Sequence, residues 1–489
     1  MQYRLVSCRA GSFRGFRLGS VDVFRGITYA RARRFHAPQM VSAPQEFINA
    51  ANYGYVCPVM KFEKPSSELA VQHRYWPMDE DCLNLNIWTP ACDDRRRPVL
   101  VWLHGGAFFD GSSIEQLAYD GAAFSEYADA VVVSVNHRLN ILGFFDLSEY
   151  GDEYRNSGNN GLMDIVCALQ WIRENIEAFG GDKDQVTLMG QSGGGSKITC
   201  LLQTPAADGL YARCINMSGV LPSLMPDEPG STRALADAMM RELGISSVKE
   251  METVPWRALF DAYLKLKPEY EKQGCSIGCT AVKNDYFLGD PVTNGFRRET
   301  SHIPLVAGTC FGEFFAFEPL MHDRNDISEE EALEMLRTRM GRAKAQRIVP
   351  LFKEAYPDKK MIDLLMYDTL FRKPVIPFIR KRSRLNDCTY SYLFDAQMPL
   401  DGGKPPWHCA DIPFALHNTH LTELTRDDPA MKKVEEKVFG WVNAFVHTGD
   451  PNCSALPEWP ACTGDEEYTM IIGEHDQVRK NHDHRLFGN

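Results

Sequence analysis

The sequence has no long apolar segment and no excess of positive charge. None of its uninterrupted apolar runs approaches the roughly 20 residues that a membrane-spanning helix needs. Its 65 Asp and Glu residues outnumber its 53 Lys and Arg residues, so the formal net charge is −12. An acidic balance disfavours nonspecific binding to nucleic acid and to anionic membranes. We therefore expect neither a nucleic acid nor a membrane as a partner.

The beginning of the sequence also lacks the features of a secretory signal peptide. Residues 1–9 contain no apolar h-region and no cleavage site, and they indicate a β-strand instead. The 14 cysteines are scattered along 489 residues, unlike those of a small disulfide-stabilised scaffold. Cys275 and Cys279 have no second pair nearby, which is poor evidence for zinc. We expect reduced thiols, a cytoplasmic location, and neither a metal nor a cofactor.

What the sequence does contain is an alternation of apolar strand-like runs and amphipathic helical segments. Strands separated by helices through short turns favour right-handed crossovers and a mostly parallel sheet. The α/β pattern predicts strands at residues 99–103, 130–135, 186–190, 214–217, 303–308, 389–394 and 468–472, and helices at residues 162–172 and 196–202.

No repeat, low-complexity tract or long linker divides the chain, so we expect one catalytic domain over residues 1–489. Residues 220–385 are mainly helical, and we expect this insertion to form part of a pocket wall or lid. One helix begins near Ser231, and Ser328 with Glu331 forms a capping-box pattern ahead of another.

A serine between two glycines is the strongest chemical signal. The strand-like residues 186–190 lead into Gly190, Ser192 and Gly194, and the helical segment 196–202 follows at once. This is the sequence context of a nucleophile elbow, in which a strained turn with positive φ exposes a serine hydroxyl. Side chains at the two glycine positions would crowd such a turn. The alternative interpretation is an ordinary Gly/Ser loop.

A serine nucleophile needs a general base, normally histidine, and a carboxylate that orients it. In the α/β-hydrolase order both follow the serine, but 13 histidines and many carboxylates are available. Local context favours His408, in a proline-stiffened loop at 405–413, and Glu313, just past the strand at 303–308. Most loop histidines are solvated or structural, and a lone glutamate is more typical of the surface.

The negative charge that develops on a carbonyl oxygen requires preorganised N–H donors. Gly193, directly after the serine, can provide one such donor. Residues 104–108 follow an earlier strand and contain two glycines, so their backbone can approach a substrate and provide the others. An ordinary βα turn is the alternative for this segment.

Together these segments resemble the type-B carboxylesterase family, which includes para-nitrobenzyl esterases, animal carboxylesterases and cholinesterases. The likeness covers nearly the whole chain. It is carried by residues 24–30, 80–86, 104–108, 136–139, 142–144, 178–182, Trp441 and 448–451.

The resemblance implies an α/β-hydrolase fold, with a central, mostly parallel sheet flanked by helices and a helical insertion over the active site. It implies that Ser192 is the nucleophile, Glu313 the triad acid and His408 the general base and acid, with Gly106, Ala107 and Gly193 as oxyanion N–H donors. It also implies that Ser218 is the buried serine that supports the acid.

Two departures from the family pattern concern the elbow and the acid. Gln191 and Gly193 stand where the family usually has an acidic residue and alanine. Gly193 keeps its N–H, although a more flexible backbone could loosen it, and Gln191 removes a buried charge. Phe311 and Gly312 make the segment before Glu313 divergent.

The implied activity is cofactor-independent hydrolysis of a carboxylic ester through an acyl-enzyme, with a small-molecule ester and water as reactants. A lipase, an amide, carbamate or thioester hydrolase, and a catalytically silent cholinesterase-like binding protein are the alternatives. The substrate and the oligomeric state cannot be inferred. Aromatic residues beside the motifs predict a pocket for small apolar or aromatic esters, unless they are core residues: Phe108, Phe109, Phe314, Phe315 and Trp407.

Two pairs of cysteines lead to expectations about oxidation state and reactivity. Cys57 and Cys82 match a pair that is disulfide-bonded in secreted relatives, and here we expect two reduced thiols. Cys310 and Cys409 lie close in sequence to the proposed acid and base. They are either small buried hydrophobic residues or thiols whose modification inhibits the enzyme.

Overall fold

The apolar runs at 99–103 and 130–135 form adjacent parallel strands that are buried on both faces. In the computed structural model, strand β8 (Arg97–Leu103) pairs in parallel with β9 (Val131–Val135) and with β10 (Gly181–Gln191). Every residue of β8 and β9 is buried, as expected for apolar strands that do not alternate with polar residues. The structure describes residues 2–41, 47–60, 70–228, 230–320 and 322–488.

The described residues divide into two units, each of which contains both strands and helices. The N-terminal unit contains described residues from 2 to 60 and from 73 to 301, and the C-terminal unit contains residues 70–72 and the described residues from 302 to 488. The predicted Ser192 elbow belongs to the first unit, and Glu313 and His408 belong to the second.

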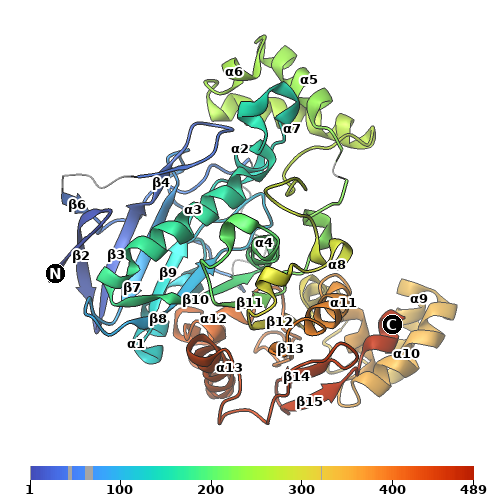
Figure 1. Cartoon of the computed structure of the whole chain (residues 1–489). Helices are drawn as coiled ribbons and strands as arrows, with labels where there is room; N and C mark the ends of the chain where they lie inside the picture. The colour runs from blue at the N-terminus through green and yellow to red at the C-terminus, as the bar shows by residue number, and fades with distance from the viewer. Residues whose placement is uncertain (1, 42–46, 61–69, 229, 321, 489) are drawn as a thin grey trace. The chain divides into compact units, whose positions relative to one another are not determined.

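The sheet of the N-terminal unit combines an antiparallel edge with a parallel centre (Figure 1). The first five strands in the spatial order given below pair antiparallel with their neighbours, and the strands from the fifth to the eighth pair in parallel. In spatial order its strands are β1 (Tyr3–Cys8), β2 (Gly11–Leu18), β3 (Val21–Thr28), β7 (Asn84–Thr89), β9, β8, β10 and β11 (Arg213–Met217). Short β6 (Phe47–Asn49) also pairs with β2, and β4 (Ala30–Arg31) pairs with β5 (Gln39–Met40).

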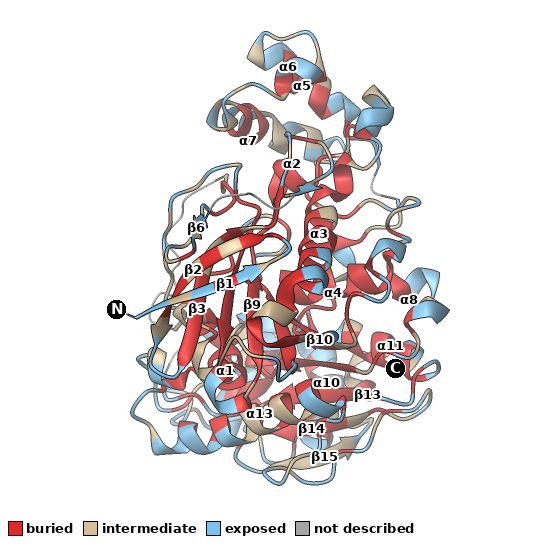
Figure 2. Cartoon of the chain, turned by 60° about the vertical axis from the view of Figure 1, so that its left-hand side comes forward, coloured by how far each residue is buried: buried red, intermediate tan, exposed pale blue. Residues whose placement is uncertain are grey.

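Helices of the N-terminal unit either pack on this sheet or form a separate group. Helices α3 and α4 lie against β10, and most of their residues are buried (Figure 2). Helices α5 and α7 pack on each other, away from the sheet in Figure 1. The helices are α1 (Ala122–Ala128), α2 (Asn140–Gly143), α3 (Asn160–Asn175), α4 (Gly193–Leu202), α5 (Arg233–Leu243), α6 (Val248–Met251), α7 (Trp256–Lys272) and α8 (Pro291–Asn294).

The helix predicted at residues 162–172 is α3, which runs from Asn160 to Asn175 and is followed by a glycine turn. A short 3₁₀ segment, Ile176–Phe179, continues the helix, and Gly180 then adopts a left-handed conformation with φ of 80°. This is the residue type that a left-handed C-cap favours, because glycine has no Cβ to clash. The turn directs the chain into β10, which carries the predicted nucleophile at its end.

The strands of the C-terminal unit also pair mostly in parallel. Strands β12 (Leu305–Cys310), β13 (Thr389–Phe394) and β14 (Tyr468–Ile472) pair in parallel, and β15 (Gln477–Lys480) pairs antiparallel with β14. Helix α11 contacts β12 and β13, and α13 contacts β14. The helices are α9 (Glu329–Met340), α10 (Arg342–Ala355), α11 (Arg372–Ser383), α12 (Ile412–Ala415) and α13 (Pro429–Thr448).

The mostly parallel strands flanked by helices bear out the α/β prediction, and a local helix signal is confirmed as well. The Ser328 hydroxyl accepts from the backbone N–H of Glu331, whose carboxylate accepts from the N–H of Ser328, so α9 begins with the predicted capping box. Among the described residues, no helix combines the length and the apolar composition needed to cross a bilayer.

A buried ion network joins α11 to the end of the chain in the C-terminal unit. Arg372 donates to both carboxylate oxygens of Asp483, at 2.7 and 2.8 Å, and to Glu467 at 2.7 Å. Tyr367 and Tyr356 donate to the same Asp483 carboxylate. The Arg372 guanidinium holds the pKa of Asp483 far below its usual value against the opposing effect of burial. The paired charges are therefore a structural requirement of this unit.

Removal of one partner from this network should be strongly destabilising. We expect R372M to lower the free energy of unfolding by about 3–5 kcal/mol, because two carboxylates remain buried without their cation. Arg485 provides a matched control, since its ion pair with Glu354 is exposed on both sides. R485A should cost less than about 1 kcal/mol. Urea denaturation followed by circular dichroism measures both values, and equal losses would contradict this account.

Candidate functional site

Ser192 lies in the strained turn that its flanking glycines predict. Its φ is 57° and its ψ is −125°, and it connects the end of β10 to the first residue of α4. A Cβ on Gly190 would lie 2.6 Å from the carbonyl carbon of Gly194, and a Cβ on Gly194 would lie 2.0 Å from the oxygen of Leu103. Glycine is therefore required on both sides of the serine. The positive φ expected for an elbow is confirmed.

The segment predicted to provide oxyanion donors packs directly against this turn. A Cβ on Gly193 would lie 2.1 Å from the oxygen and 2.4 Å from the Cα of Ala107. The backbones of the two segments thus touch, with no room for a side chain. Ala107 itself has a φ of 50°, and Gly106 has a φ of 80°. The structure therefore brings Gly193 into backbone contact with Ala107, which directly follows Gly106 within the N-terminal unit.

Ser218, the predicted supporting serine, follows the last residue of β11 and is completely buried. Its φ of 47° is positive, as is that of Ser192. The neighbouring Ser192 N–H donates to the oxygen of Met217, at 2.8 Å, so the ends of β10 and β11 are tied together. Backbone strain of this type costs energy and is concentrated at functional sites.

In the C-terminal unit, Glu313 and His408 are joined by a hydrogen bond. His408 Nδ1 donates to Glu313 Oε2, and the backbone N–H of Cys310 donates to Glu313 Oε1 at 2.7 Å. Glu313 is completely buried, and about one tenth of the His408 side chain is exposed. Because Nδ1 faces the carboxylate, Nε2 is the ring nitrogen left for proton transfer. A buried carboxylate that orients an accessible imidazole is the arrangement of a general base.

Two further carboxyl groups surround this pair, and sequence reasoning did not identify them. Burial and the negative charge of Glu313 raise the pKa of Asp368 to about 7 and that of Asp411 to about 6. Asp368 accepts the backbone N–H groups of residues 370–372, and Asp411 accepts the Tyr392 hydroxyl at 2.8 Å. Both side chains fix the segments that surround His408. No local sequence pattern distinguishes them from surface aspartates.

Aromatic rings contact the His408 imidazole from two segments. The ring centroid of Phe314 lies 4.4 Å away, and that of Phe371, at the start of α11, lies 4.7 Å away and is nearly parallel. Phe314 is 58% exposed, whereas Phe371 is buried. Phe371 was missed because its contact with His408 joins segments distant in sequence. Its proximity to Arg372 links the buried ion network to the orientation of the histidine.

The other predicted pocket aromatics have varied environments. Phe108 is completely buried and stacks on Phe144, with ring centroids 4.6 Å apart. Trp407 is buried and packs against the exposed ring of Phe317 at 5.6 Å. Phe109 and Phe315 are half-buried. Phe314 is thus the predicted aromatic residue that both contacts the histidine and faces solvent.

All fourteen cysteines lie among the described residues, and each is a free thiol. Cys57 and Cys82 are both buried, in agreement with the expectation of reduced thiols. Burial also raises the pKa of the Cys310 thiol well above its usual value, which makes it unreactive. Cys409 is half-buried and has a φ of 75°, beside His408.

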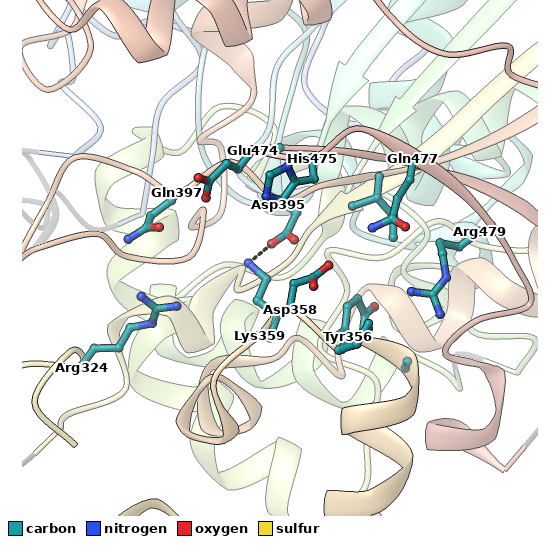
Figure 3. Close-up of a pocket in the computed structure, with 14 residues that line it drawn as sticks. Arg324, Tyr356, Asp358, Lys359, Asp395, Gln397, Glu474, His475, Gln477 and Arg479 are labelled. Atoms are coloured by element: carbon teal, nitrogen blue, oxygen red, sulfur yellow. Dashed lines mark ion pairs between the residues drawn. The ribbon is translucent and has the colours of Figure 1, made fainter. Parts of the chain in front are cut away.

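A separate polar pocket of about 110 Å³ lies elsewhere in the C-terminal unit (Figure 3). Lys359 and Asp395 form an ion pair across it, with 2.6 Å between Nζ and Oδ1. Arg324 and Arg479 extend toward it from other segments. Neither Glu313 nor His408 is among the residues that line it, so this pocket does not belong to the histidine site.

Comparisons with known proteins agree with this geometry. The model of the carboxylesterase family matches residues 2–486. The chain is 30% identical to the para-nitrobenzyl esterase of Bacillus subtilis (strain 168), over 96% of this chain and 95% of that protein. It is also 30% identical to the phenmedipham hydrolase of Pseudarthrobacter oxydans, over 95% of this chain and 94% of that protein.

A solved structure is similar over almost the whole length. It is an esterase from anaerobic Clostridium hathewayi that can hydrolyze aliphatic aromatic polyesters. The two chains are 45% identical, with a TM-score of 0.95 over 99% of this chain and 98% of that one. The match of the family model over residues 2–486, together with these relatives, shows that the chain belongs to the carboxylesterase family and is a carboxylesterase.

Proposed function

We propose that the protein hydrolyses carboxylic esters through an acyl-enzyme formed on Ser192, with His408 as general base and acid and Glu313 as the residue that orients it. The observation that carries the proposal is the buried Glu313 carboxylate hydrogen-bonded to Nδ1 of an accessible His408. The strained Ser192 turn supports it independently, because such a turn exposes a hydroxyl.

Each group has a defined role in the proposed reaction. His408 Nε2 removes the proton from Ser192 as its oxygen attacks the ester carbonyl. The N–H groups of Gly106, Ala107 and Gly193 stabilise the resulting oxyanion. His408 then returns the proton to the departing alcohol, and water attacks the acyl group by the same route. The Glu313 carboxylate stabilises the imidazolium that forms transiently in both halves.

Replacement of the nucleophile tests this mechanism. We expect S192A to remain folded and to lose kcat on a nitrophenyl ester by a factor on the order of 10⁴ or more, because the covalent route disappears. A fluorophosphonate probe should label the wild-type protein once and S192A not at all, as measured by intact-protein mass spectrometry.

Ser196 is a suitable control because it lies one helical turn away and is also buried, with its hydroxyl donating to the oxygen of Gly219 at 2.8 Å. S196A should retain both the labelling and most of the activity. Wild-type turnover in S192A, or labelling that survives this substitution, would refute the proposed nucleophile.

The contact between Gly193 and Ala107 makes a second prediction. G193A introduces a Cβ that the Ala107 backbone must avoid, so the oxyanion donors shift apart. We expect kcat to fall by up to about 10²–10³-fold, the range for loss of one donor, with a smaller change in KM. Steady-state kinetics on a nitrophenyl ester measures this.

Gly440 in α13 provides the matched control. A Cβ there would meet only the Cys453 sulfur at 3.4 Å and more distant atoms, which is an ordinary contact. G440A should leave kcat unchanged and keep or raise stability, since alanine favours a helix. If G193A retains wild-type kcat, the backbone contact does not control the donors.

We propose that the preferred substrates carry an aromatic group. The exposed Phe314 ring beside His408 supports this, since an aromatic acyl or alcohol group can stack on it. The similar Clostridium hathewayi esterase can hydrolyze aliphatic aromatic polyesters, which makes aromatic diesters and their oligomers the first substrates to examine.

Phe314→Ala tests the substrate preference. An aromatic pair contributes about 0.5–1.5 kcal/mol, so kcat/KM for a terephthalate diester should fall about 2- to 10-fold relative to an acetate ester. Phe47 is similarly exposed, at 52%, but lies on short β6 of the N-terminal unit. F47A should leave the ratio between the two substrates unchanged. An equal ratio in wild type and F314A would exclude Phe314 from substrate recognition.

We also propose that the protein acts in the cytoplasm. The fourteen free thiols support this proposal, including the buried Cys57 and Cys82, because a reducing compartment maintains unpaired cysteines.

A further inference from the structure

A buried lysine occupies the helix that begins at the proposed nucleophile. Lys197, five residues after Ser192, is the one lysine among the described residues with a completely buried side chain. Transfer of an ammonium group out of water is unfavourable unless other interactions compensate it. The proposed reaction assigns it no step. Its position therefore requires an explanation.

The contacts of Lys197 are with the oxyanion loop, residues 104–108. Its Nζ donates to the carbonyl oxygen of His104 at 3.0 Å, at the beginning of the loop. The same Nζ lies 6.0 Å from the ring centroid of Phe108, at the end of the loop, within the range of a cation–π interaction. One side chain on α4 thus contacts both ends of the segment that contains Gly106 and Ala107.

The two histidines beside Lys197 are uncharged. Burial lowers the pKa of His104 and of His137 well below the usual value, so both stacked imidazoles are neutral. Burial also lowers the pKa of Lys197, to about 7, and the negative charge of Glu115 opposes that change. The His104 Nδ1–H donates to the oxygen of Gly105 at 2.9 Å, so this imidazole stabilises the loop without charge.

The proposed oxyanion donors come from two separate segments of the chain. Gly193 belongs to the start of α4, and Gly106 and Ala107 belong to the loop. Gly193 and Gly194 press their backbones against the loop but provide no side chain to hold it. Lys197 supplies that connection from the second turn of the same helix.

We propose that Lys197 is a positioning residue that clamps residues 104–108 to helix α4 and thereby holds the oxyanion donors of both segments in register. It acts through the His104 carbonyl and the Phe108 ring and does not touch the substrate. This inference rests on the proposed function, because it requires Gly106, Ala107 and Gly193 to bind an oxyanion.

The test compares K197M with T199V. Methionine has a similar length but neither a charge nor a donor. Thr199 lies on the same helix and is equally buried, but its hydroxyl bonds the Gly195 oxygen and the Asn216 side chain instead of the loop. The substrate is a nitrophenyl ester, and the second probe is an aryl trifluoromethyl ketone. Its adduct with the serine places an oxyanion in the same site, as a transition-state analogue does.

We expect K197M to lower kcat about 10- to 100-fold, below the effect of losing a donor outright, with KM changed less than about 3-fold. Its inhibition constant for the trifluoromethyl ketone should rise by the same factor as kcat falls. T199V should change neither. K197Q, whose amide can still donate to His104, should lie between K197M and wild type.

Several outcomes overturn the inference. They are wild-type kcat in K197M, an unchanged inhibition constant despite a lower kcat, and misfolding of both K197M and K197Q while T199V folds, which would make Lys197 a stability residue. Labelling by the fluorophosphonate separates this inference from the proposed function. If the wild-type protein labels at Ser192 and K197M keeps its kcat, only the role of Lys197 fails. If Ser192 does not label, the proposed function fails first.

Discussion

The direct contact between two backbones is the constraint on which the N-terminal unit depends. Strand β10 ends in a turn whose glycines lie against residues 103–107, at distances where no Cβ fits. Protein interiors tolerate such contacts only where glycine removes the side chain. As a result, main-chain geometry determines the positions of the Ser192 backbone and of the N–H groups of Ala107 and Gly193. Side-chain flexibility has little influence on them.

In the C-terminal unit, buried ion pairs position the segments around His408. Arg372 anchors α11 with ion pairs to Asp483 and Glu467, and the preceding Phe371 packs against the His408 ring. Asp368 fixes the start of the same helix by accepting three backbone N–H groups. The His408 imidazole is therefore oriented by the carboxylate at its Nδ1 and by the Phe371 ring, whose helix is held in place by the ion pairs of Arg372.

The sequence predicts those parts of the molecule that local chemistry determines. The apolar runs predicted β8, β9, β12, β13 and β14, and the glycines predicted the strained turn at Ser192. The Ser328 capping box is equally local. The family, the α/β-hydrolase fold and the carboxylesterase class also follow from motifs distributed along the chain.

What the sequence could not predict depends on contacts between distant segments. Phe371 and Asp368 precede α11 without any motif, and their relation to His408 exists only once the chain has folded. Phe108 is the opposite case. Its place beside a glycine motif predicted a pocket residue, but its side chain is completely buried in the core. Lys197 lies in the segment predicted to be helical, but its burial was not predicted. The sequence of a helix alone does not show which other segments of the folded protein cover a single polar residue.

The carboxyl groups around Glu313 make the stability of this region depend on proton binding. Asp368 and Asp411 have a pKa of about 7 and about 6 in the folded protein, above the ordinary value near 4. Between these values the folded chain holds protons that the unfolded chain has released, so each rise in pH through this window removes stability. Glu467, whose pKa is about 2, acts in the opposite direction, and its contribution is lost only in stronger acid. A site built to keep one carboxylate buried beside a histidine thus ties the folding equilibrium of its surroundings to mildly acidic conditions.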